Sequence, residues 1–296
     1  MARDPMRVRK PFAGRGKRAV HARGTVLAAA LLALTAGPAL AQFQEYRRRD
    51  RGGAGVPSSQ FATFAEKGDL FVYPYYEYYW NHAGEYQPSE LGYEGEADYF
   101  GAYSAHEALI FLGYGVSDRL FLEMEAAWIT ARQRKGDGDP TSFPAELEAS
   151  GVGDVEAQLR YRWREETVEA AEVFSYFETV FPLQEKNSLI GTSSWEFKYG
   201  MGLARSRSWG TTILRASIGF ADGTPELGEY AVEYVRGLGE RLRLYGAVEG
   251  TQDEVELITE AQLFLARNVK LKLNSAFGLT KKAPDWAPEV GVMFVF

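Results

Sequence analysis

The sequence predicts an all-β protein, a transmembrane antiparallel up-and-down β-barrel of about twelve strands. Three observations predict this fold. From residue 69 onward, apolar residues recur at every second position in segments of roughly ten residues, as in strands with one face in lipid. The chain ends on such a segment, with Val290, Val292, Phe294 and Phe296. No stretch after residue 41 approaches the roughly 20 consecutive apolar residues of a membrane helix.

The first 41 residues are expected to be a cleavable signal peptide. Basic residues precede a short apolar run from Thr25 to Thr35, and the segment ends on the small-x-small pattern Ala39-Leu40-Ala41. The run has only about half the length that a membrane anchor needs. Residues 42–68 contain an arginine-rich and a glycine-rich run without periodicity, so we expect a flexible periplasmic N-terminal segment. Residues 69–296 are then the barrel.

Each predicted strand alternates an apolar with a polar face. In one of them Leu122 and Met124 alternate with Glu123 and Glu125, and the other segments follow the same pattern. The predicted strands are 69–80, 103–115, 119–130, 152–163, 172–183, 195–205, 211–220, 229–237, 241–250, 255–265, 269–280 and the C-terminal segment. An even number of strands leaves both termini of the chain in the periplasm.

Two further features favour a membrane barrel over a soluble β-sandwich, whose strands also alternate. Aromatic residues gather near the strand ends on the apolar face, as in the girdles at the two membrane interfaces. They are Trp80, Tyr114, Trp128, Trp163, Trp195, Phe220 and Tyr230. Long connections such as 81–102 and 131–151 alternate with short ones such as 116–118, matching external loops and periplasmic turns. Closure into a barrel leaves no unpaired sheet edge in hydrocarbon.

Charge and composition exclude several classes of function. The chain has 33 Lys and Arg against 40 Asp and Glu. Because the leader holds eight of those bases and one of the acids, the remainder carries a net charge near −14, which disfavours nucleic acid as a partner. The absence of cysteine excludes thiol chemistry and cysteine-bound metals. No histidine pair has metal-ligand spacing and no glycine-rich loop opens a helix, so we predict no metal and no cofactor.

The polar faces of the strands carry the candidate functional residues, which we expect to line the lumen. They are Tyr73, Tyr75, Glu77, Glu107, Glu123, Glu125, Glu156, Arg160, Arg162, Glu178, Lys198, Arg215, Glu233, Arg243, Glu260 and Lys272. Two interpretations remain open: the charges pair into a filled polar core, or they line a water-filled path. Acids left unpaired would favour cations over anions. The tyrosines could stack on an aromatic substrate or fill space beside glycines.

An outer-membrane lipid hydrolase is the rival class, because such enzymes use a serine and a histidine near the membrane edge. Ser104 and His106 lie two residues apart on one predicted strand face. That spacing separates them by about 7 Å, and no third residue beside them would orient the imidazole. We therefore predict no catalytic residues.

Several short motifs resemble a family of outer-membrane transporters labelled for the meta-pathway of phenol degradation. The motifs are Gly151-Val152-Gly153-Asp154 with its following strand, Phe181-Pro182-Leu183, Tyr199-Gly200-Met201-Gly202, and the turn Gly115-Val116-Ser117-Asp118. The similarity spans most of residues 69–296. It implies a barrel of about twelve strands that moves small hydrophobic or aromatic compounds, and it carries no catalytic residues to transfer. The glycines of the first motif are expected to let the strand bend.

The sequence therefore predicts an outer-membrane channel or transporter for passive uptake or efflux of small molecules, with aromatic or hydrophobic compounds as one candidate class. The alternative is a structural barrel without transport. The expected partners are outer-membrane lipid, lipopolysaccharide, a small-molecule solute and the barrel assembly machinery, which would read the C-terminal strand ending at Phe296. We expect a monomer.

Overall fold

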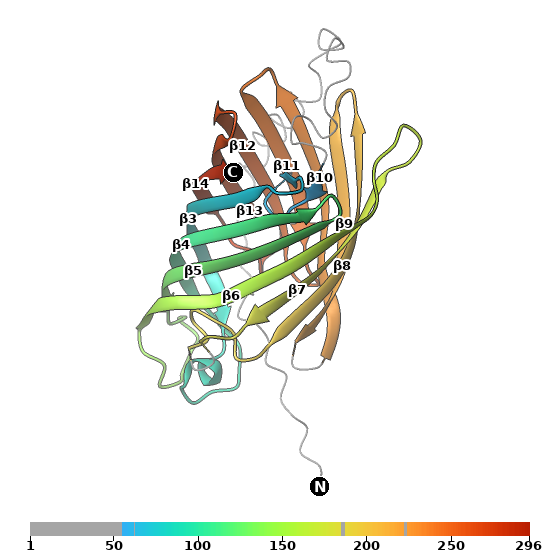
Figure 1. The fold of residues 1–296 in the computed structure, drawn as a ribbon. Helices are drawn as coiled ribbons and strands as arrows, with labels where there is room; N and C mark the ends of the chain where they lie inside the picture. Colours follow the sequence, from blue (N-terminus) through green and yellow to red (C-terminus); the bar gives the residue numbers. More distant parts are fainter. Residues whose placement is uncertain (1–54, 62, 185–186, 222–223) are drawn as a thin grey trace.

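The computed structural model describes residues 55–61, 63–184, 187–221 and 224–296. Twelve antiparallel strands pair in chain order and close into a barrel, because the last strand pairs with the first (Figure 1). The strands are β3 (Leu70–Tyr86), β4 (Tyr99–Ser117), β5 (Leu120–Arg134), β6 (Glu146–Arg164), β7 (Glu172–Phe181), β8 (Glu196–Arg207), β9 (Gly210–Ala221), β10 (Thr224–Leu238), β11 (Leu242–Gly250), β12 (Val255–Ala266), β13 (Val269–Gly278) and β14 (Ala287–Val295). The predicted fold class and strand number are confirmed.

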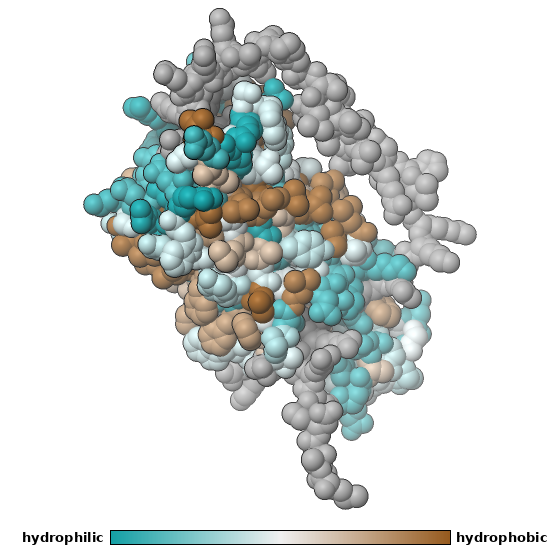
Figure 2. Space-filling view, turned by 90° about the vertical axis from the view of Figure 1, so that its right-hand side faces the viewer, coloured by the Kyte–Doolittle hydropathy of each residue, from teal (hydrophilic) through white to brown (hydrophobic). Residues whose placement is uncertain are grey.

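The outer surface of the barrel is apolar. On β5, Leu122 and Met124 are 42% and 46% exposed. Phe121 and Glu123, which alternate with them, point inward and are buried. Figure 2 shows hydrophobic side chains across the middle of one face, with hydrophilic ones towards its top and lower right. So continuous an apolar exterior on a closed sheet is what contact with lipid requires. Among the described residues, no helix has the length and apolarity needed to cross a membrane.

The two ends of the barrel differ in their connections. The turns 118–119, 208–209, 239–241 and 267–268 are short, and they lie, with the seven-residue connection 165–171, at the end where Leu70 and Phe296 meet through two 3.0 Å backbone hydrogen bonds. At the opposite end the connection 251–254 is short, but 87–98, 135–145, 182–195 and 279–286 are longer, and the first of these four contains the 3-10 helix η2 (Pro88–Leu91). We call these the short-turn end and the long-loop end.

The four strands β3 to β6 extend further towards the long-loop end than predicted. Much of the expected loop 131–151 is strand, because β5 runs to Arg134 and β6 starts at Glu146. Outward side chains here pair across the ladder: Arg134 Nε lies 2.9 Å from the Glu146 carboxylate. The same holds for β3, which ends at Tyr86, and for β4, which begins at Tyr99. Strands that leave the apolar zone lose the apolar alternation that marks them in the sequence.

A small hairpin lies inside the barrel, where the blue strands of Figure 1 are seen within the ring. It consists of β1 (Val56–Pro57) and β2 (Phe64–Ala65), which pair antiparallel. The prediction of a flexible segment over 42–68 is therefore wrong for its described part, residues 55–61 and 63–68. Val56 and Phe64 are buried, so packing holds this segment in place. The sequence of the segment has no periodicity from which this packing could be predicted. Residues 42–54 and the predicted signal peptide lie outside the described residues.

Candidate functional site

The tip of the hairpin is bonded to the wall made by β5 and β6. The Ser59 backbone N–H donates to Glu123 Oε1 at 2.9 Å, and Gln60 Nε2 donates to Glu125 Oε2 at 3.1 Å. Arg160, which pairs with Glu123 at 3.4 Å, also donates to the Pro57 carbonyl oxygen at 3.3 Å. Charged acceptors and donors strengthen such bonds in a buried setting. Inward polar residues of the barrel thus hold the hairpin.

Contacts on the far wall complete this attachment. Gln262 Nε2 on β12 donates to the Phe61 carbonyl oxygen at 3.0 Å, and the Lys272 ammonium lies 5.1 Å above the Phe61 ring. Phe64 enters an apolar cluster in the barrel interior. Its partners are Phe174, Tyr176, Ala204, Ile213, Val235, Tyr245, Ala247 and Ile258. Because it touches opposite walls, the hairpin bridges the lumen in the half nearer the short-turn end.

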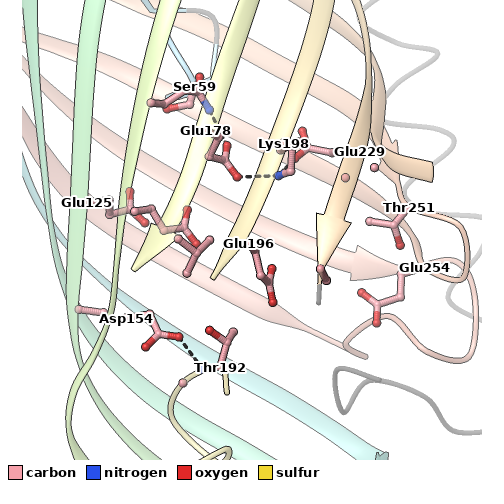
Figure 3. A pocket seen from close by; sticks show the side chains of 18 of the residues that line it. Ser59, Glu125, Asp154, Glu178, Thr192, Glu196, Lys198, Glu229, Thr251 and Glu254 are labelled. Atoms are coloured by element: carbon pink, nitrogen blue, oxygen red, sulfur yellow. Dashed lines mark hydrogen bonds and ion pairs between the residues drawn. The ribbon is translucent and has the colours of Figure 1, made fainter. Parts of the chain in front are cut away.

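Above the hairpin lies a cavity of about 1190 Å³. Its floor includes Ser59, Gln60 and Phe61, and its lining reaches the loops of the long-loop end at residues such as Leu91 and Thr251. Figure 3 shows the carboxylate and hydroxyl groups of several strands and loops gathered around this space. The cavity therefore reaches the long-loop end, and the hairpin lies between it and the short turns.

The cavity lining is rich in acidic residues. Seventeen of its described lining residues carry a carboxylate, and only four carry a cationic group. The four are Arg160, Lys198, Arg215 and Lys282. A low-dielectric cleft lined by charges of one sign concentrates counter-ions and repels ions of its own sign. In their ionised form these carboxylates would therefore favour cations over anions.

On the side formed by β7 to β11, acids and bases are paired. Lys198 lies 2.8 Å from Glu178 and 3.2 Å from Glu229, the triplet seen at the top of Figure 3. Arg215 contacts the carboxylates of Glu229, Glu233 and Glu249. These residues form a continuous network across neighbouring strands, which offsets part of the desolvation that each buried charge costs. We call this side the paired wall.

On the side formed by β14, β3, β4 and β5, acids face acids. Glu77 stands directly opposite Glu289 on one neighbouring strand and opposite Glu107 on the other. Glu125 stands opposite Glu156 on β6 and interacts electrostatically with both Glu156 and Glu289. No ion pair with a base is recorded for Glu77 or Glu107 within the described parts of the chain. Like charges directly opposite one another destabilise a sheet, so these acids do not serve the stability of the barrel.

Tyrosines accompany these carboxylates. Tyr75 and Tyr103 line the cavity beside Glu77 and Glu107. The Tyr75 ring stacks on Tyr73 with centroids 4.6 Å apart, so its orientation is fixed by the neighbouring ring. We define the acidic wall as Glu77, Glu107, Glu125 and Glu289 together with Tyr75 and Tyr103.

The sixteen residues expected in the lumen fall into two groups. Ten line the cavity, namely Tyr75, Glu77, Glu107, Glu123, Glu125, Glu156, Arg160, Glu178, Lys198 and Arg215. The other six are buried in the interior outside the cavity lining, namely Tyr73, Arg162, Glu233, Arg243, Glu260 and Lys272. The two interpretations left open by the sequence thus describe different parts of one interior, a filled polar network and an open space above the hairpin.

The Gly-x-Gly-Asp motif has a role beyond the expected bend. The register of β6 against β5 does shift at this motif, as a bulge requires. In addition, the Asp154 carboxylate accepts the backbone N–H groups of Leu183, at 2.9 Å, and of Thr192, which Figure 3 shows. A Cβ on Gly153 would meet the Ile190 carbonyl oxygen at 3.3 Å, so glycine lets the loop approach. An aspartate beside a strand bulge is the signal that could have revealed this anchor.

The described part of the anchored connection, residues 182–184 and 187–195, lies at the mouth of the cavity. Leu189 and Ile190 are buried against Ala105 and Ala131 of the barrel wall. Both loop residues also line the cavity. The motif therefore holds part of this connection against the rim of the cavity.

The serine and histidine considered for a hydrolase are not brought together. His106 Nδ1 lies 2.6 Å from the Tyr76 hydroxyl, and its ring lies 4.9 Å from that of Tyr78. Ser104 stands opposite Trp80 on β3, and within the described chain no hydrogen bond joins it to His106. His106 is thus part of an aromatic cluster on the outer surface.

Comparisons with known proteins support the fold. No protein-family model and no curated protein sequence matches the chain. An outer membrane channel from Pseudomonas putida F1 is similar in structure, with a TM-score of 0.58 and 13% identity over 81% of this chain and 99% of that one. The translocator domain of the autotransporter NalP from Neisseria meningitidis has a TM-score of 0.49 at 8% identity, covering 78% and 90%. The CymD monoaromatic hydrocarbon channel has a TM-score of 0.39 at 8% identity, covering 78% and 90%. The first likeness confirms the barrel of the outer-membrane type.

Proposed function

We propose that this chain is an outer-membrane channel for small solutes and that its internal hairpin closes the exit to the periplasm. Three features support the location: the apolar exterior, the closure of the sheet, and connections that are mostly short at one end and mostly longer at the other. The short-turn end is the periplasmic one, since short turns face the periplasm in such barrels. The proposed partners are outer-membrane lipid, lipopolysaccharide and the barrel assembly machinery, and the proposed state is a monomer.

The single observation that carries the proposal is the cavity above the hairpin. At about 1190 Å³ it is slightly larger than the pockets that hold one small molecule, so it admits small solutes and excludes folded chains. A solute that enters from the long-loop end meets Gln60 and Phe61 at the floor. Passage then requires the hairpin to move, because its tip bonds to opposite walls.

The nature of the lining bears on the solute. Leu109, Phe111 and Ile129 supply apolar lining suited to aromatic or hydrophobic compounds, the class named by the family resemblance. Carboxylates outnumber these side chains, however, and a neutral hydrocarbon gains nothing from them. Polar or cationic solutes with an apolar part therefore fit better than hydrocarbons.

A structural barrel without transport is the second candidate. It is favoured by the buried ion pair of Arg160 and Glu123, which ties β5 and β6 to each other beside the hairpin. In that case the hairpin would be a permanent part of the core, and no solute would pass under any condition.

Liposome swelling separates these functions. We expect proteoliposomes with the intact chain to admit small amino acids and sugars slowly. Phe64→Ala should admit them several-fold faster, because loss of a buried aromatic side chain costs about 3–5 kcal/mol and loosens the hairpin. Trp209→Ala is the matched control, since Trp209 is an exposed aromatic residue at the same end of the barrel. If neither the intact chain nor Phe64→Ala admits any solute, the channel is refuted and the structural barrel remains.

A further inference from the structure

We propose that the acidic wall binds a small organic ammonium ion, a primary amine with an apolar body. This inference rests on the proposed function and names the class of solute that the cavity takes. The argument uses the charge of the wall, two amide groups at its base and the tyrosine rings beside it.

The first step is the excess of carboxyl groups over bases along the acidic wall. Glu77 interacts electrostatically with Glu289, Glu107, Glu125 and Glu256. Of the bases nearby, Lys272 pairs with Glu260 at 3.2 Å and also interacts with Glu289, whereas Lys198 and Arg215 belong to the paired wall. A bound cation would relieve this repulsion, since an opposite charge within hydrogen-bond distance is the strongest available partner for a carboxylate.

The second step is a pair of amide groups with unused acceptors. Gln60 lines the cavity floor and is 8% exposed; its Nε2 donates to Glu125, while its Oε1 has no hydrogen-bond partner among the described residues. Asn274 lines the same cavity, donates to Glu289 at 3.3 Å, and likewise leaves Oδ1 without a partner in the described chain. Each amide donates one hydrogen bond to a wall carboxylate, while its oxygen, covered by neighbouring protein atoms, receives none from the described residues. A primary ammonium group carries three N–H donors, and an amide oxygen turned towards the cavity would accept one of them.

The third step concerns the rest of the ligand. Tyr75 and Tyr103 present rings to the cavity beside the carboxylates, and Leu109 and Phe111 lie in the same lining. An ammonium group is attracted to aromatic faces, and an apolar body packs against these side chains. A hydrated metal ion would use only the carboxylates. No group of three or more metal-binding side chains with suitable geometry is present in the described parts of the chain.

Binding can be measured without passage, by titration calorimetry on the detergent-solubilised chain. We use benzylammonium as the probe at neutral pH, with benzyl alcohol as its uncharged counterpart and benzoate as its anionic one. We expect saturable binding of benzylammonium alone. Glu77→Gln and Glu107→Gln should each raise its Kd about tenfold, as expected for loss of one charge-assisted contact. Tyr103→Leu should raise it about threefold through the lost ring contact.

Glu226→Gln is the matched control, because Glu226 lines the same cavity from β10 and lies outside the acidic wall. It should leave the Kd within about twofold, and circular dichroism should show an intact barrel for every variant. Equal binding of benzyl alcohol, an equal loss in Glu226→Gln, or tight Mg²⁺ binding that displaces the amine would each overturn the proposal. Because detergent removes transport from the measurement, absence of binding refutes this site alone. Absence of swelling with binding intact refutes the channel alone.

Discussion

The alternation along each strand determines whether a side chain points into the barrel or away from it. It does not determine which residue that side chain pairs with. Arg160 and Glu123 are 2% and 6% exposed and lie 3.4 Å apart. The period of two predicts that both point inward. Which acid meets which base depends on strand register and on the hairpin, and neither can be read from composition. The sequence therefore predicts the lining of the lumen and leaves its pairing, and the contrast between the two walls, undetermined.

Asp139 gives a prediction at this scale, outside the membrane-spanning strands. Burial alone would raise the pKa of Asp139, but hydrogen bonds from Thr141 and from the Tyr86 hydroxyl, at 2.7 Å, outweigh it and lower the pKa. A carboxylate with a lowered pKa stabilises the folded loop above its unfolded pKa of about 3.9, and this stabilisation is lost as pH falls through the folded value. Hydrogen exchange of loop 135–145, corrected for intrinsic rates, should therefore lose protection below about pH 4. Asp139→Asn should show weaker protection that no longer changes over this range; an unchanged pH dependence in Asp139→Asn would contradict the assignment.

At the scale of elements, the regular strands are predictable and the exceptions share one cause. Where lipid imposes an apolar face, as on β5 between Leu122 and Trp128, the strand is found from the sequence. The hairpin of β1 and β2 has only two residues in each strand, so no period can develop. The loop 182–195 is held by Asp154, a single residue whose partners are backbone groups. Contacts of this kind depend on the assembled barrel rather than on local pattern.

The Asp154 anchor leads to a prediction about the mouth of the cavity. Asp154→Ala removes the acceptor for several backbone N–H groups of loop 182–195, each bond to a charged group being worth about 1.5–3 kcal/mol. We expect faster limited proteolysis within this loop and lower hydrogen-exchange protection, with the barrel melting temperature almost unchanged. Asp137→Ala, in another loop of the same end, is the control. If the loop of Asp154→Ala stays as resistant as in the parent chain, the anchor is not what holds it.

On the scale of the whole molecule, the barrel holds an acid-rich cavity that reaches the long-loop end, with the internal hairpin on the side of the short turns. The cavity reaches from the long loops to Ser59, Gln60 and Phe61, and the buried charges below it are largely paired. Architecture and compartment can be argued from the sequence because lipid imposes a pattern on every strand. The position of the hairpin inside the barrel cannot be argued in this way, because the hairpin belongs to a segment outside the barrel strands. Whether solutes pass therefore depends on whether this hairpin moves.

The most direct test of this account is the ionic current through the barrel while the hairpin is reversibly cross-linked to the wall. The chain contains no cysteine, so Ser59→Cys with Glu123→Cys can be bridged selectively at a contact where the Ser59 N–H now lies 2.9 Å from the Glu123 carboxylate. A bis-methanethiosulfonate reagent forms the bridge and dithiothreitol removes it, with the Ser59→Cys single variant as control. The account predicts openings in planar bilayers for the unbridged protein, silence once the bridge forms, and recovery on reduction. Equal currents with and without the bridge would contradict it.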